Sequence, residues 1–190
     1  MNIYDQVKVI QRGKTIPFYQ AGYNLVFLDT ETTGLDPYKH EIVEFGMIDW
    51  QGKESHWLIK PNNLQNASPR ALEINGYNQD RWANEGISST EFYQLVKPKL
   101  NRAIIVCSNP HFDLGFLRAL YNQEGDGKVN WHYKPICIGA MFTAQMSLIA
   151  GQHQIADHYS VDVPERHRAL VDAKVCKSVF EKIIEDAICA

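Results

Sequence analysis

The stretch Leu25-Val26-Phe27-Leu28-Asp29-Thr30-Glu31-Thr32-Thr33-Gly34 is an apolar run that ends in two carboxylates one residue apart. Four consecutive apolar residues closed by a glycine-containing turn are typical of a buried strand, and side chains at i and i+2 of a strand share one face. Asp29 and Glu31 are therefore expected to point the same way from the end of a central strand. Two such carboxylates repel by roughly 4 kcal/mol at an effective dielectric of about 20, so we expect a cation beside them. Hard oxygen ligands of this kind select Mg²⁺ or Mn²⁺.

The composition is that of one compact domain. The chain has 190 residues, 45% of them hydrophobic, which is enough to bury a full core. Its net charge of -3 excludes a broad basic surface, so any binding of nucleic acid must be local. The start lacks the layout of a signal peptide, and no apolar run approaches the roughly 20 residues of a membrane span. We therefore expect a soluble, cytoplasmic protein with no membrane partner.

Strand and helix patterns alternate along the chain. β-branched and aromatic residues predict further strands at 41–50, 55–59, 103–107 and 135–138. Helical spacing and caps predict helices near 70–73, 89–100, 110–124, 140–149, 154–158 and 169–187. This alternation indicates an α/β fold, a mixed five-stranded sheet flanked by helices. We expect residues 1–23 to be an N-terminal extension, either a hairpin or a docked arm, and residues 24–190 to be the main domain.

A third acidic group is expected at the start of a helix. Asn109 is a capping residue type and Pro110 suits the first helical position, which places Asp113 in the first turn. Phe112 and Phe116 follow on the same helix. For both rings the pattern favours core packing over stacking on nucleic-acid bases.

A fourth acid, Asp172, follows His167 by five residues. On a continuous helix that spacing would separate the two side chains by roughly 140°. Both can face one site only if His167 precedes the helix, as Pro164 upstream suggests. Asp172 would then lie in the first turn, where the helix dipole favours its ionised form. Four carboxylates and one imidazole are what phosphodiester hydrolysis with two cations requires.

Three ordered motifs resemble a known family: Asp29 to Leu35, Asn109 to Asp113, and His167 to Ala173. They are similar to the motifs of the DEDDh, or DnaQ-like, 3′-to-5′ exonucleases. That family includes the proofreading subunit of bacterial replicative DNA polymerase, ribonuclease T and oligoribonuclease. The resemblance covers about Asn24 to Ile184 and implies a ribonuclease H-like fold. It also implies a hydrolase that releases nucleoside 5′-monophosphates from the 3′ ends of single-stranded DNA or RNA.

The resemblance implies roles for individual residues. Two Mg²⁺ ions, for which Mn²⁺ can substitute, would be bound by Asp29, Glu31, Asp113 and Asp172, and the general base would be His167. Contacts with the terminal nucleotide are implied for Thr32, Thr33 and Leu35. Tyr77, at the rim of that pocket, and Asn109 are further candidates for substrate binding. The chain departs from the family in having Asn75 in place of the usual His of an Ile-His-Gly stretch, and Cys137-Ile138 where many members have Asp-Thr.

Two other functions remain open at this point. The chain could be a non-catalytic module that binds nucleic acid or a partner, although the complete acidic set argues against lost turnover. It could also be a proofreading subunit of a DNA polymerase. Because only 18 residues follow Asp172, a stand-alone nuclease is the favoured alternative. The sequence leaves open the choice between DNA and RNA and the oligomeric state, with a homodimer as one option.

Overall fold

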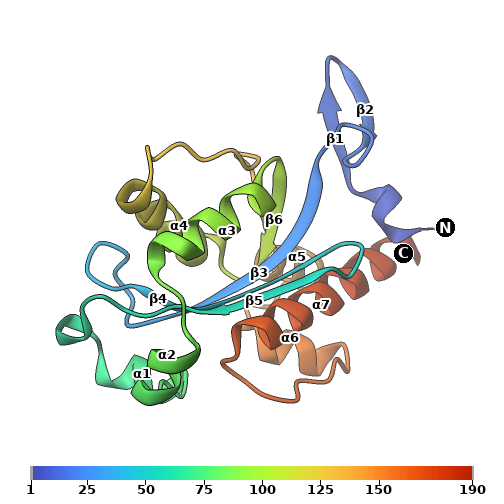
Figure 1. The fold of residues 1–190 in the computed structure, drawn as a ribbon. Helices are drawn as coiled ribbons and strands as arrows, with labels where there is room; N and C mark the ends of the chain where they lie inside the picture. The colour runs from blue at the N-terminus through green and yellow to red at the C-terminus, as the bar shows by residue number, and fades with distance from the viewer. Residues whose placement is uncertain (1, 190) are drawn as a thin grey trace.

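The strand that carries Asp29 and Glu31 lies at the centre of a five-stranded sheet. The computed structural model describes residues 2–189, and its main sheet has the order β5-β4-β3-β6-β7 (Figure 1). β3 pairs antiparallel with β4 and parallel with β6. The strands are β3 (Asn24–Thr32), β4 (Ile42–Asp49), β5 (Glu54–Leu58), β6 (Ala103–Cys107) and β7 (Ile136–Cys137). The predicted mixed α/β sheet is confirmed.

Helices cover both faces of this sheet, which explains why β3 begins as a continuous apolar run. Val26 and Leu28 pack with α3 (Ser89–Leu100) and α4 (Pro110–Glu124) in one core cluster. Leu25 and Phe27 point to the other face, where a second cluster joins them to the C-terminal helices. Those helices are α5 (Ile138–Met146), α6 (Gln152–His158) and α7 (Ala169–Cys189). By the same alternation Asp29 and Glu31 belong to the α7 face.

The segment between β5 and α3 differs from the prediction. It contains a 3-10 turn, η2 (Leu64–Asn66), and the expected short helix, α1 (Pro69–Ile74). A second helix, α2 (Gln79–Glu85), lies where the sequence predicted none. Trp82 alone among the residues of α2 is buried, so the sequence shows no apolar stripe there. The helix is instead secured by its Asn78 cap and by the Trp82 ring nitrogen, which donates to the carbonyl oxygen of Val43 at 2.6 Å.

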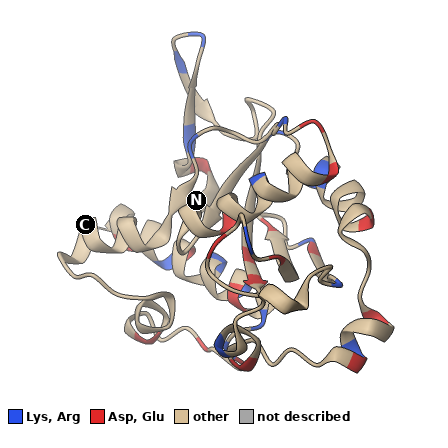
Figure 2. Cartoon of the chain, turned by 90° about the vertical axis from the view of Figure 1, so that its left-hand side faces the viewer, with Lys and Arg blue, Asp and Glu red and all other residues tan. Residues whose placement is uncertain are grey.

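The N-terminal extension forms its own small sheet. After a 3-10 turn, η1 (Ile3–Gln6), strands β1 (Lys8–Gln11) and β2 (Lys14–Pro17) make a hairpin that stands away from the main sheet (Figure 1). Lys and Arg residues, coloured blue in Figure 2, lie along this hairpin. Its base is docked, because Tyr4 and Phe18 are buried in the α7-face core. Both predicted alternatives, hairpin and docked arm, therefore describe part of it.

The helices of residues 2–189 differ from membrane-spanning helices. None of them combines the length and the apolar sequence that a crossing needs.

Candidate active site

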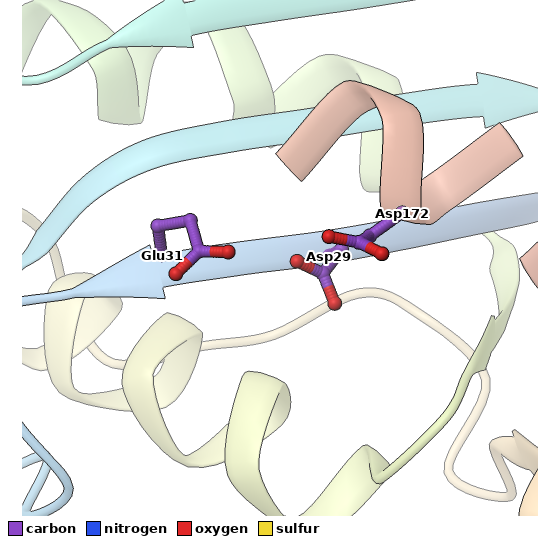
Figure 3. Close-up of side chains that lie close together, drawn as sticks. All are labelled: Asp29, Glu31 and Asp172. Atoms are coloured by element: carbon purple, nitrogen blue, oxygen red, sulfur yellow. The ribbon is translucent and has the colours of Figure 1, made fainter. Parts of the chain in front are cut away.

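Three carboxylates meet where β3 passes under the first turn of α7. Asp29, Glu31 and Asp172 each offer one oxygen, and these oxygens lie within 4.8 Å of one another. Figure 3 shows the Asp29 and Asp172 carboxylates facing each other, with Glu31 further along the same strand. The expected common face of Asp29 and Glu31 is thus present. A cluster made only of carboxylate oxygens fits a hard divalent cation, which is the group that the sequence resemblance implies.

Asp113 lies beside this cluster, in the first turn of α4 as predicted. β6 pairs with β3 only as far as Phe27, so the later part of β3 has no parallel neighbour. There the Thr30 backbone nitrogen and hydroxyl donate to Asp113 Oδ1 at 3.0 and 2.9 Å. Asp113 lines the same cavity as the other three acids but stands outside the group within 4.8 Å.

Burial raises the pKa values of Asp29, Glu31 and Asp113, and repulsion between carboxylates adds to the rise at Asp29 and Glu31. Burial, and then repulsion from Asp113 and Glu31, hold the pKa of Asp29 well above its usual range. Burial and the nearby carboxylates raise the pKa of Glu31 from 4.5 to about 8. Burial raises the pKa of Asp113 to about 6, against the opposing effect of its hydrogen bonds from Thr30. Such a cluster holds protons near neutral pH unless cations replace them, which further fits a metal site.

His167 precedes α7, as its spacing from Asp172 requires. Its backbone is left-handed, with φ of 58°, which turns the chain just before the helix begins. The ring remains half exposed, and its Nδ1 lies 4.0 Å from Glu31 Oε1. His167 therefore faces the carboxylates from the solvent side of the cavity.

A second imidazole, His153, also faces the site. From α6 its Nε2 donates to Asp172 Oδ1 at 2.9 Å, and its ring lies 5.7 Å from that of His167. Gln152 also contacts Asp172. No sequence motif marks His153, because its contact with Asp172 joins two residues 19 positions apart on different helices.

Next to the cluster, an ion pair joins Arg168, the residue just before α7, to Glu44 of β4. Arg168 Nη1 lies 3.3 Å from Glu44 Oε2, and Glu44 is 1% exposed. His56 Nε2 contacts the other oxygen of Glu44 at 2.9 Å. Because Glu44 pairs with Glu31 across β3 and β4, Arg168 is a cation close to the metal-binding acids, and it lowers the pKa of Glu31.

The loop after β3 presents Leu35 to solvent. The Thr32 hydroxyl donates to the carbonyl oxygen of Gly34 at 2.6 Å, and the Thr33 hydroxyl accepts from the Glu41 backbone at 2.9 Å. Thr32 and Thr33 are both buried, so their side chains shape the loop. Leu35 is 82% exposed at its tip.

Asn109 occupies the N-cap position of α4, but its side chain makes no capping hydrogen bond there. It lines the carboxylate cavity instead, together with Phe112. Phe116 packs in the core as predicted, whereas Phe112 is only partly buried. The core-packing prediction is therefore incomplete for Phe112, which forms a wall of the cavity.

Tyr77 lies apart from the carboxylates. Its ring packs 5.0 Å from that of Trp82 in a small cluster on β4 and β5. Asn75 links this region to β3, because its Nδ2 donates to the Thr32 carbonyl oxygen at 3.0 Å. Asn75, which stands where the family has a His, thus supports the end of β3, the strand that carries Asp29 and Glu31.

Two hollows adjoin each other at this end of the sheet. The carboxylate cavity has a volume of about 290 Å³ and is lined by all four acids, His153 and His167. A larger groove of about 820 Å³ lies between the Leu35–Tyr38 loop and α4. Asn109 and Phe112 line both, so the groove continues from the cavity.

Comparison with known proteins places this geometry in a family. The family model described as "Exonuclease" matches residues 26–180. A PolC-type DNA polymerase III of Thermotoga maritima is 34% identical over 165 residues, which cover 84% of this chain but 12% of that polymerase. The ribonuclease T of Haemophilus ducreyi is 30% identical, with 84% of each chain covered.

The fold comparison agrees. The zinc-bound complex of E. coli exonuclease I with single-stranded DNA matches with a TM-score of 0.75 at 15% identity, over 86% of this chain and 41% of that one. This chain therefore spans less than half the length of that enzyme and a small part of the polymerase. On the match over residues 26–180 and the shared fold, the chain belongs to the exonuclease family, within the DnaQ-like group of the ribonuclease H-like superfamily.

Proposed function

We propose that this protein is a metal-dependent 3′-to-5′ exonuclease that removes nucleoside 5′-monophosphates from single-stranded ends. The observation that carries the proposal is the meeting of Asp29, Glu31 and Asp172 within 4.8 Å, with Asp113 in the same cavity. Family membership supports the reaction class. The four acids are the proposed ligands, and Mg²⁺ is the proposed ion, with Mn²⁺ as a substitute.

In the proposed reaction, water attacks the terminal phosphorus and the bond to the departing 3′ oxygen breaks. Two bound cations would supply positive charge to the attacking and the departing oxygens. His167 is the proposed general base: its exposed ring can take the proton of the water and pass it to solvent. The departing oxygen gains a proton and becomes the new 3′ hydroxyl. Glu31, 4.0 Å from the ring, would stabilise the imidazolium.

The groove beside the cavity supports a single-stranded substrate. Leu35 and Tyr38 are 82% and 91% exposed at its edge, and Phe112 joins it to the carboxylates. Aromatic side chains bind unpaired bases by stacking, and apolar side chains pack beside them. A base inside a duplex has both faces covered by its neighbours and cannot make these contacts. We place the terminal nucleotide between Leu35 and Asn109, with the Leu35 loop held by Thr32 and Thr33. Tyr77 remains a candidate for contacts at the outer edge.

We also propose the domain division expected from the sequence. Residues 24–190 form the exonuclease domain and residues 1–23 an extension docked on it. The start of the family match at residue 26 and the separate β1–β2 sheet support this division.

The direct test is digestion of end-labelled single- and double-stranded DNA and RNA with Mg²⁺ or Mn²⁺. We expect mononucleotide release from single strands that collapses in Asp29→Asn and Asp113→Asn, which keep the shape of the side chains. The matched control is His158→Ala, because His158 lies on α6 and packs on Phe142 away from the acids. Binding without cleavage in Mn²⁺ would instead support a non-catalytic module.

A proofreading role is the second candidate, favoured by the identity to a stretch of the Thermotoga maritima polymerase. It predicts faster removal of a mismatched than of a matched primer terminus, and stable co-purification with a polymerase. Equal rates on both primers would leave the stand-alone nuclease as the function.

A further inference from the structure

Asp172 is held by two side chains of α6 that the family motifs do not include. Gln152 Nε2 donates to the Asp172 carbonyl oxygen at 2.9 Å and to its Oδ1 at 3.2 Å. His153 Nε2 donates to the same Oδ1 at 2.9 Å. Both hydrogen bonds to the carboxylate end on one oxygen, which leaves Oδ2 available to a cation. We infer that Gln152 and His153 are positioning residues that orient Asp172 for metal binding.

Such support is needed because the cluster is repulsive. Asp172 is 5% exposed and lies against two other carboxylates that all carry charge when a cation binds. Without a hydrogen-bond partner, the Asp172 side chain would lower its electrostatic energy by rotating away from Asp29. Two donors on Oδ1 oppose that rotation and stabilise the ionised form that binds a cation.

The helix that carries the donors is itself fixed. Gln154 accepts a hydrogen bond from the backbone of Gly151 at 2.9 Å, which secures the start of α6. Ile155 and Ala156 are fully buried in the core cluster that also contains residues of α7. The two donors are therefore presented to Asp172 from a packed element and are not free to move with a loop.

The inference rests on the proposed function, because it concerns the same metal site. Outer partners of ligating carboxylates typically change metal affinity by about 10- to 100-fold. We expect the double variant Gln152→Ala/His153→Phe, which removes both donors and keeps a ring, to weaken Mn²⁺ binding by about that factor. Mn²⁺ affinity is measured by electron paramagnetic resonance of the free ion, without substrate.

Two further variants separate positioning from a general structural effect. His153→Gln keeps a hydrogen-bond donor of similar reach, so it should bind Mn²⁺ nearly as tightly as the wild type and more tightly than His153→Phe. His158→Phe, on the same helix and away from Asp172, should bind Mn²⁺ as the wild type does. At saturating Mn²⁺ the double variant should regain most of its kcat, with KM for the oligonucleotide unchanged.

The outcomes are distinct. If the folded double variant binds Mn²⁺ as tightly as the wild type, the inference is overturned while the proposed function stands. If the wild type binds no Mn²⁺ at all, both are overturned. Should the double variant fail to fold, the single variants Gln152→Ala and His153→Phe carry the same comparison, and unchanged affinity in both would overturn the inference.

Discussion

Gly46 lies so close to the start of α7 that a Cβ on it would be 2.1 Å from the backbone nitrogen of Leu170. Gly46 also pairs with Asp29 across β3 and β4. The missing side chain therefore lets the first turn of α7 rest directly on the sheet, beside the strand that carries Asp29. Asp172 follows Leu170 by two residues, so this close approach of backbones is what brings the two carboxylates together.

Gly46→Ala should damage both stability and metal binding. The contact is with backbone, so α7 must shift, and overpacking of this kind typically costs about 1–3 kcal/mol in the free energy of unfolding. We expect a lower urea midpoint and weaker Mn²⁺ binding. Gly115→Ala is the matched control, because its Cβ would meet Pro37 at an ordinary 3.5 Å inside α4. A Gly46→Ala protein as stable as the wild type would show that the helix can move without cost.

The parts of the site that the sequence predicted are those governed by local geometry. The spacing of Asp29 and Glu31 on one strand, and the positions of Asp113 and Asp172 in first turns, follow from strand and helix periodicity alone. The contact of His153 with Asp172 depends on how α6 packs on α7, and helix α2 is held by one buried tryptophan. Neither the His153 contact nor helix α2 produces a periodic pattern in the sequence, because each depends on tertiary contacts between segments distant in the chain.

The metal-free protein should lose stability as the pH rises. The pKa values of Glu31 and Asp113 are raised in the folded state, to about 8 and about 6. The folded protein then keeps protons that the unfolded chain has released, so the free energy of unfolding falls between about pH 5 and pH 8. Mn²⁺ competes with those protons, and its affinity should rise over the same range.

Urea unfolding in EDTA across this pH range measures the effect. Glu31→Gln, which cannot ionise, should flatten the slope above about pH 6. A free energy of unfolding that rises with pH in the metal-free wild type would contradict the raised pKa values.

His167→Ala should slow the chemical step with little effect on metal binding. The ring lies 4.0 Å from Glu31 and outside the group of carboxylates, so its loss leaves the proposed ligands in place. Removing a general base typically lowers kcat by about 10²- to 10⁴-fold. Single-turnover cleavage measured against pH, with Mn²⁺ affinity in parallel, tests this. A wild-type rate and pH profile in His167→Ala would remove its assignment as the base.

Tyr38→Ala should weaken binding of oligonucleotides without changing the chemistry. Loss of stacking on one base costs about 1–3 kcal/mol, so KM should rise about tenfold or more. The ester p-nitrophenyl thymidine 5′-monophosphate has no second base, and its hydrolysis should be unaffected. The Tyr38 backbone bond to Asp36, at 3.0 Å, remains in the variant. Equal losses on both substrates would mean that Tyr38 acts on the catalytic centre and not in the groove.

Arg168→Ala should destabilise the protein and shift its pH dependence. Glu44 is 1% exposed, and removal of one partner of a buried pair typically costs about 3–5 kcal/mol. Arg168 is 15% exposed, so we expect the lower end of that range. Because Arg168 lowers the pKa of Glu31, its loss should also move the rise of Mn²⁺ affinity to higher pH.

The double variant Arg168→Met/Glu44→Gln separates these two effects. It removes the buried charge together with its partner, so it should recover much of the free energy of unfolding that Arg168→Ala loses. Glu44 also raises the pKa of Glu31, so losing both charges should leave the pH dependence of Mn²⁺ binding closer to wild type than in the single variant. Recovery of stability without return of the pH dependence would mean that Arg168 acts on Glu31 independently of Glu44.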